Sequence, residues 1–100
     1  MHIHNVYFWL KTGSSAEDLA AFEDGLRSLI ASPEVSDGHF GRPADSEARD
    51  VVDNTYTYGL VLTFPDTAAH DEYQEGPNHA AFVADHLERW ERVQVYDLQT

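Results

Sequence analysis

Two side chains in the second half of the chain, Tyr73 and His79, have the types and spacing for proton-transfer chemistry. His79 follows Pro77, where we expect a helix to begin, and the positive end of a helix dipole favours a neutral imidazole. A neutral imidazole can take a proton near pH 7, while a tyrosine hydroxyl can hydrogen-bond to a carbonyl or enolate oxygen. The alternative is purely structural: His79 caps a helix, and Tyr73 packs with its hydroxyl in water.

The other histidines do not predict a metal centre. His2 and His4 alternate on an expected strand and so point the same way, as two metal ligands would. However, His2 lies at an end that we expect to fray, and no third ligand has a fixed spacing. His39, His70 and His86 are scattered, and we expect His70 and His86 to be solvated. We therefore expect no metal and no cofactor.

Composition limits the class of protein. One hundred residues form one domain, 1–100, with no room for a second core. The 18 acidic and 6 basic residues give a net charge of −12, which repels phosphate backbones and anionic lipid, so we expect no nucleic-acid or membrane partner. There is no cysteine, which excludes thiol catalysis. The first residues show neither a signal peptide nor a spanning helix, so the expected location is cytoplasmic.

Hydrophobic periodicity predicts four strands. Large side chains on both faces mark residues 3–11 as a strand, and residues 55–64, TYTYGLVLTF, form the clearest one. In the latter, Tyr56, Tyr58, Leu60, Leu62 and Phe64 are expected on one face. Weaker strands are expected at 35–41 and at 93–96, with Asp97 beyond the last.

Two helical regions separate these strands. Ser15 and Asp18 have capping-box spacing, and the apolar stripe Leu19, Phe22, Leu26, Leu29 and Ile30 follows. A short helix to about residue 73 and a longer helix over about 78–91 are expected later, interrupted by Gly76-Pro77. The polar, acidic stretch 42–54 indicates an exposed loop.

The order β-α-β-β-α-β is that of an α+β, ferredoxin-like fold: a four-stranded antiparallel sheet with helices on one face. The opposite face would then be open and too apolar for a monomer, since it carries Ile3, Asn5, Tyr7, Trp9, Val61, Tyr96 and Leu98. Packing two such sheets face to face would cover it. The sequence therefore predicts a homodimer through the open sheet face.

The helix-side face predicts a pocket. Side chains from the first and third strands and from the second helical region converge there, namely His4, Val6, Phe8, Leu10, Tyr58, Leu60, Leu62, Tyr73, His79, Phe82 and Trp90. A space that is aromatic and apolar, with a few polar groups, is typical of a small-molecule site.

Three segments also carry a resemblance to a known family. HNVYFWLK, YTYGLVLTF, and Tyr73-Gln-Glu-Gly-Pro-Asn-His79 with Phe82 resemble the stress-responsive dimeric α/β-barrel (Dabb) family. The resemblance covers nearly the whole chain and implies a ferredoxin-like protomer whose sheets pair into a dimeric α/β barrel. Many relatives have His-Pro where this chain has Gly76-Pro77, so one family histidine is missing here.

The resemblance also implies a site. One plant member is a polyketide cyclase, in which a histidine base and a neighbouring tyrosine promote aldol cyclisation. By that likeness His79 is the base, Tyr73 its partner, and His4 occupies the corresponding first-strand position. The implied ligand-binding wall consists of Val6, Phe8, Phe22, Leu60, Leu62, Phe82, Trp90, Val93 and Val95.

Three functions remain open at this point. The first is a stress-responsive protein that binds a small apolar ligand between sheet and helices. The second is a cofactor-free cyclase or isomerase that uses His79 as general base with Tyr73. The third is a haem- or quinol-type monooxygenase, because related dimeric barrels include such enzymes.

Overall fold

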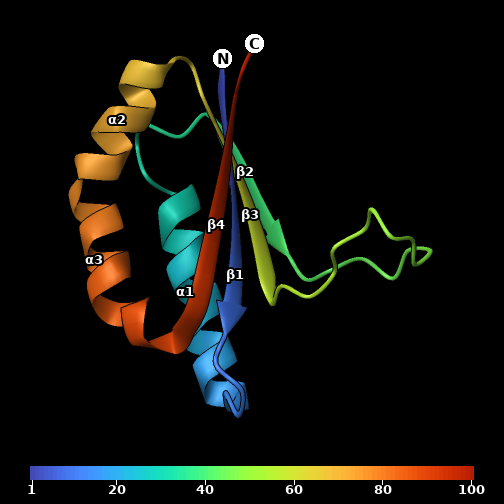
Figure 1. The fold of residues 1–100 in the computed structure, drawn as a ribbon. Helices are drawn as coiled ribbons and strands as arrows, with labels where there is room; N and C mark the ends of the chain where they lie inside the picture. The colour runs from blue at the N-terminus through green and yellow to red at the C-terminus, as the bar shows by residue number, and fades with distance from the viewer.

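The computed structural model describes residues 1–100 as an antiparallel sheet with helices on one face (Figure 1). In chain order the elements are β1 (His2–Leu10), α1 (Ala16–Ile30), β2 (Asp37–Gly41), β3 (Tyr58–Phe64), α2 (Thr67–Glu75), α3 (Pro77–His86), a 3-10 turn (Leu87–Arg89) and β4 (Trp90–Gln99). The strand order β2-β3-β1-β4 places the first and last strands side by side. The predicted ferredoxin-like α+β fold is confirmed.

Strand β1 lies between β3 and β4 and is apolar on both faces. Its even-numbered residues, from His2 to Leu10, are buried under the helices, and its odd-numbered residues are only partly covered on the open face. The β4 residues opposite the open face of β1 are more exposed: Tyr96 is 60% and Leu98 is 56% exposed. The apolar open face expected from the sequence is therefore present in the protomer.

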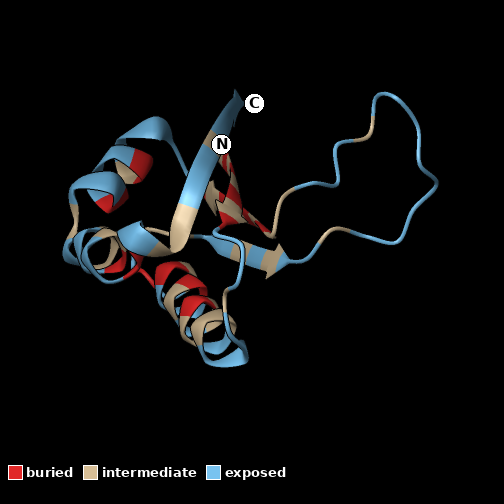
Figure 2. Cartoon of the chain, turned by 60° about the horizontal axis from the view of Figure 1, so that its bottom comes forward, coloured by how far each residue is buried: buried red, intermediate tan, exposed pale blue.

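Helix α1 begins and packs as its sequence pattern predicts. The Ser15 hydroxyl accepts a hydrogen bond from the Asp18 N–H (3.1 Å), and the Asp18 carboxylate accepts one from the Ser15 N–H (3.0 Å). This capping box satisfies two backbone donors at the helix start. Along the predicted stripe, Phe22, Leu26 and Leu29 are buried against the sheet, and the buried parts of α1 point inward in Figure 2.

Several strand boundaries differ from those expected. β2 begins at Asp37, and β3 begins at Tyr58 rather than at residue 55. The Tyr56 ring packs 4.9 Å from that of Tyr7 on the open face, so the prediction that it shares the buried face of β3 is wrong. β4 begins at Trp90, which the sequence placed in a helix, and it continues past Asp97. Pairing with β1 along its whole length extends β4 in both directions.

The segment between β2 and β3 is the expected exposed loop. It extends away from the sheet and helices in Figures 1 and 2, and most of its residues are exposed. Only its final residues return to the sheet, where the Trp9 indole N–H donates to the Thr55 hydroxyl at 2.9 Å. The loop therefore leaves the protomer beside the open face of the sheet.

The prediction that His70 and His86 are solvated is wrong, because both are buried. The His86 ring packs 5.0 Å from Phe82 and 5.4 Å from Phe22 (ring centroids). Gly25 of α1 leaves the space for it, since a Cβ there would lie 2.5 Å from the His86 Nε2 atom. His86 is thus part of the packing between α1 and α3.

Candidate functional site

A cavity of about 210 Å³ lies on the helix side of the sheet. Ten of the predicted site residues line it together: His4, Val6, Phe8, Leu60, Tyr73, His79, Phe82, Trp90, Val93 and Val95. Strands β1, β3 and β4 supply one wall, and helices α1, α2 and α3 supply the other. The lining is mostly apolar, with His4, Tyr73, Gln74 and His79 as its polar groups.

Two predicted wall residues do not reach this cavity. Phe22 and Leu62 are fully buried in the core, where the Phe22 ring lies 5.1 Å from that of Phe8 and 5.5 Å from that of Phe82 (centroids). Their contribution is to support the wall rather than to form it. The cavity is instead completed by Leu29, Gln74 and Val83, which the sequence analysis did not select.

Tyr73 and His79 meet where α2 gives way to α3. Gly76 ends α2, and Pro77 occupies the first position of α3, which brings His79 to the first turn of that helix. The two rings are 5.5 Å apart (centroids) at an angle of 72°. The chain therefore brings the predicted pair together at the cavity.

The environment of the cavity determines the protonation states of Tyr73 and His79. Burial lowers the pKa of His79, and the nearby His70 lowers it further, so the imidazole is neutral near pH 7. Burial raises the pKa of Tyr73, with a further contribution from Glu34, so its hydroxyl keeps its proton. No hydrogen bond contributes to either shift. The arrangement offers one proton acceptor and one hydrogen-bond donor.

His4, the third predicted catalytic residue, pairs with a carboxylate that the sequence analysis missed. His4 lies directly opposite Asp97 in the pairing of β1 and β4, and its Nδ1 donates to Asp97 Oδ1 at 2.6 Å. Burial lowers the pKa of His4 in spite of the opposing effect of Asp97. Its ring centroid is 6.2 Å from that of Tyr73. Asp97 therefore fixes the tautomer of an imidazole at the cavity wall.

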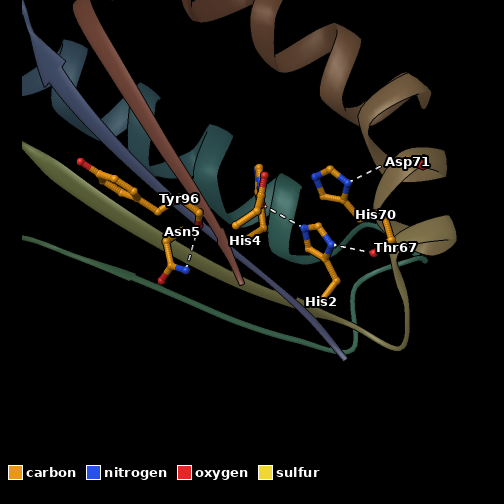
Figure 3. A network of polar contacts seen from close by, with 8 residues as sticks. His2, His4, Asn5, Thr67, His70, Asp71 and Tyr96 are labelled. Atoms are coloured by element: carbon orange, nitrogen blue, oxygen red, sulfur yellow. Dashed lines mark hydrogen bonds and ion pairs between the residues drawn. The ribbon is translucent and has the colours of Figure 1, made fainter. Parts of the chain in front are cut away.

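Two more histidines lie beside this pair (Figure 3). His2 is 7% exposed and His70 is 8% exposed, and their rings stack at a centroid distance of 4.0 Å. His2 does not fray, because it pairs with Phe64 of β3 and Gln99 of β4. His70 lies three residues before Tyr73, on the same inward face of α2, and this spacing was the available signal for its burial.

The strand order and the cavity under the helices define a ferredoxin-like α+β protein with one uncovered sheet face. Residues 3–100 match the sequence profile of the Stress responsive A/B Barrel Domain, Dabb, and the chain belongs to this family. The resemblance found in the sequence is confirmed. Among proteins with curated descriptions, none matches this sequence. None of the helices is long and apolar enough to cross a membrane.

Solved structures from several organisms share the fold. A Dabb family protein from Mesorhizobium loti is 29% identical, with 99% of this chain and 95% of that chain covered and a TM-score of 0.79. A dimeric ferredoxin-like protein of unknown function from Thermobifida fusca is 17% identical, covers 99% and 90%, and has a TM-score of 0.79. A hydroxynitrile lyase from Passiflora edulis is 18% identical, covers 97% and 90%, and has a TM-score of 0.80.

Proposed function

We propose that this chain forms a homodimer in which each protomer binds a compact, mainly apolar molecule in the cavity beside Tyr73 and His79. The cavity itself carries this proposal: it is apolar, with a few polar groups at one side. Its volume of about 210 Å³ is below the roughly 300–1,000 Å³ of pockets for drug-sized ligands. That size suits a small carbonyl or phenolic compound better than a macrocycle such as haem.

The open sheet face supports the homodimer. Tyr7, Trp9, Tyr56 and Tyr96 surround a hollow of about 280 Å³ on this face, and the Arg92 guanidinium lies 4.1 Å from the centre of the Trp9 ring. Tyr96 is exposed and the other three rings are half-buried, and aromatic groups at a protein surface are typical of protein interfaces. The dimeric ferredoxin-like relative from Thermobifida fusca agrees with this assembly.

Filling the cavity should weaken ligand binding. Val95 lines the cavity from β4, and phenylalanine at this position would occupy the space that a ligand needs. We expect Val95→Phe to weaken binding of a compact aromatic ketone, acetophenone, by about 100-fold or more. The ligand could enter only if the phenyl group and the cavity wall moved apart, and such overpacking costs a few kcal/mol of binding free energy. Binding is measured by calorimetry. The matched control Val51→Phe lies in the exposed loop, at 81% exposure, and should bind as the wild type does. Equal affinity in all three proteins would exclude this cavity as the site.

A second candidate function is cofactor-free proton transfer on such a ligand. The observation that favours it is the neutral His79 beside the protonated Tyr73, both at the cavity and neither engaged by the chain's own hydrogen bonds. His79 would take a proton from the carbon next to a carbonyl, the Tyr73 hydroxyl would hydrogen-bond to the enolate oxygen, and His79 would return the proton or the enolate would attack a second carbonyl. The hydroxynitrile lyase among the similar structures is a case of an enzyme with this fold.

Proton exchange tests this candidate without knowledge of the substrate. The chain should accelerate deuterium incorporation at the central carbon of 1,3-dicarbonyl compounds, as measured by NMR. His79→Ala should lower that rate by about 100-fold or more, because general-base catalysis contributes roughly 10²–10⁴-fold. Tyr73→Phe should lower it as well, whereas the exposed His39→Ala should not. If the wild type and His79→Ala exchange at the same rate, His79 is not the base.

A further inference from the structure

We propose that His2, His4, His70 and Asp97 form a binding site for a divalent transition metal of the zinc type. This inference goes beyond ligand binding in the cavity and does not depend on it. One ligand atom from each of the four side chains lies within 4.8 Å of the others. No other group of at least three such side chains in the chain comes together in this way.

The fold brings these residues together from three elements, and Figure 3 shows His2 and His4 of β1 beside His70 of α2. His2 and His4 are two residues apart on β1 and so point to the same, helix-covered face. Asp97 lies opposite His4 on β4, and α2 brings His70 over both histidines. The four ligands would therefore tie the first strand, the last strand and a helix to one another.

The strongest indication of a bound metal ion is the unpartnered ring nitrogen of His70. Its Nδ1 donates to the Asp71 carboxylate at 3.1 Å, which leaves Nε2 as the nitrogen that can present a lone pair. That Nε2 is buried and has no hydrogen-bond partner. A buried acceptor without a partner is destabilising. A histidine held by a carboxylate on one nitrogen, with the other nitrogen free, is the usual arrangement of a metal ligand.

The other two histidines both direct one ring nitrogen at Asp97. Both His2 Nε2 and His4 Nδ1 donate to the same oxygen of Asp97, at 3.0 and 2.6 Å. The second nitrogen of His2 is held by the Thr67 hydroxyl at 3.2 Å. For these two nitrogens to bind a metal ion, the single proton of each neutral ring would move to its other nitrogen, so that His2 Nε2 and His4 Nδ1 each present a lone pair. The Nδ1–H of His2 would then donate to the Thr67 hydroxyl.

The ligand set selects the class of metal. Three imidazoles and one carboxylate suit zinc and neighbouring transition metals, whereas Mg²⁺ and Ca²⁺ prefer oxygen ligands. Tetrahedral zinc places its ligand atoms roughly 3.3 Å apart, whereas the four ligand atoms here are up to 4.8 Å apart. Side-chain rotations that move the ligand atoms closer by about 1–1.5 Å would therefore give the tetrahedral geometry. The net charge of −12 also favours approach of a cation.

Calorimetry of untagged protein, first stripped with a chelator, tests the proposal. We expect one Zn²⁺ per chain, bound with a dissociation constant at or below the micromolar range. Co²⁺ should give the visible absorption of a tetrahedral site. At zinc concentrations about 100 times the dissociation constant, the melting temperature should rise by about 10 °C. Absence of stoichiometric binding by the wild type would overturn the proposal.

Variants locate the site. His70→Phe keeps an aromatic ring in the stack but removes the free nitrogen, and we expect affinity for Zn²⁺ to fall by more than about 100-fold. Asp97→Asn should also weaken it and abolish the Co²⁺ spectrum. The matched control is His39→Phe, since His39 is exposed on β2 and contacts only Asp37 among charged groups. Wild-type affinity in both His70→Phe and Asp97→Asn would show that zinc binds elsewhere and would refute this site.

Discussion

We expect the double variant Tyr96→Glu and Leu98→Glu to be a monomer and the wild-type chain to be a dimer. Both side chains lie on the open face of β4 and are more than half exposed in the protomer, so the protomer itself tolerates the change. A face-to-face dimer would bury two glutamates from each subunit without partners, in a protein that already carries a charge of −12. We expect the dimer to be weakened by at least about 1,000-fold, or about 4 kcal/mol.

Sedimentation velocity at micromolar concentration distinguishes the two states. The control is Val51→Glu, which places a glutamate in the exposed loop rather than on the sheet and should leave the dimer intact. Circular dichroism of the double variant should retain the spectrum of the folded protomer. A wild-type chain that is monomeric under these conditions, or a double variant that stays dimeric, would contradict the proposed assembly.

The second large effect is expected from Phe22→Ala in α1. Phe22 has no exposed surface, and its ring lies 5.1 to 5.5 Å from those of Phe8, Tyr58 and Phe82 (centroids). Removing a buried phenyl group and leaving a cavity lowers the free energy of unfolding by about 3–5 kcal/mol. Because the free energy of unfolding of a domain is only about 5–15 kcal/mol, a fraction of the variant should be unfolded at about 37 °C.

Urea unfolding measures this loss. Phe40→Ala is the matched control, because Phe40 lies on the edge strand β2 and is only half-buried. The control should lose clearly less stability than Phe22→Ala. Equal losses in the two variants would mean that the ring cluster around Phe22 is not the main core of the protomer.

Patterns within single elements predicted most of the fold. The alternation along β1 and the stripe of α1 depend only on spacing, so the buried residues Val6, Phe8, Phe22 and Leu26 were identified from the sequence. The capping box of Ser15 and Asp18 is equally local. Local patterns could not give the ends of β4, since these are set by pairing with β1 over its whole length.

The candidate site was predicted in part for the same reason. Tyr73 and His79 are close in sequence, and the turn at Gly76 brings them together, so their spacing was informative. Asp97 and His4 are 93 residues apart and meet only through strand pairing. His2 and His70 each look solvated when read alone, and their burial results from three elements that meet at one corner of the sheet.

The most direct test of the central claim, that the cavity beside Tyr73 and His79 holds a compact apolar molecule, is amide chemical-shift mapping by NMR with acetophenone. We predict that the largest shifts occur at residues around the cavity, including His79, Phe82 and Val95, with few on the open face. Shifts confined to Tyr7, Trp9 and Tyr96 on the open face, or no saturable shifts at all, would contradict it.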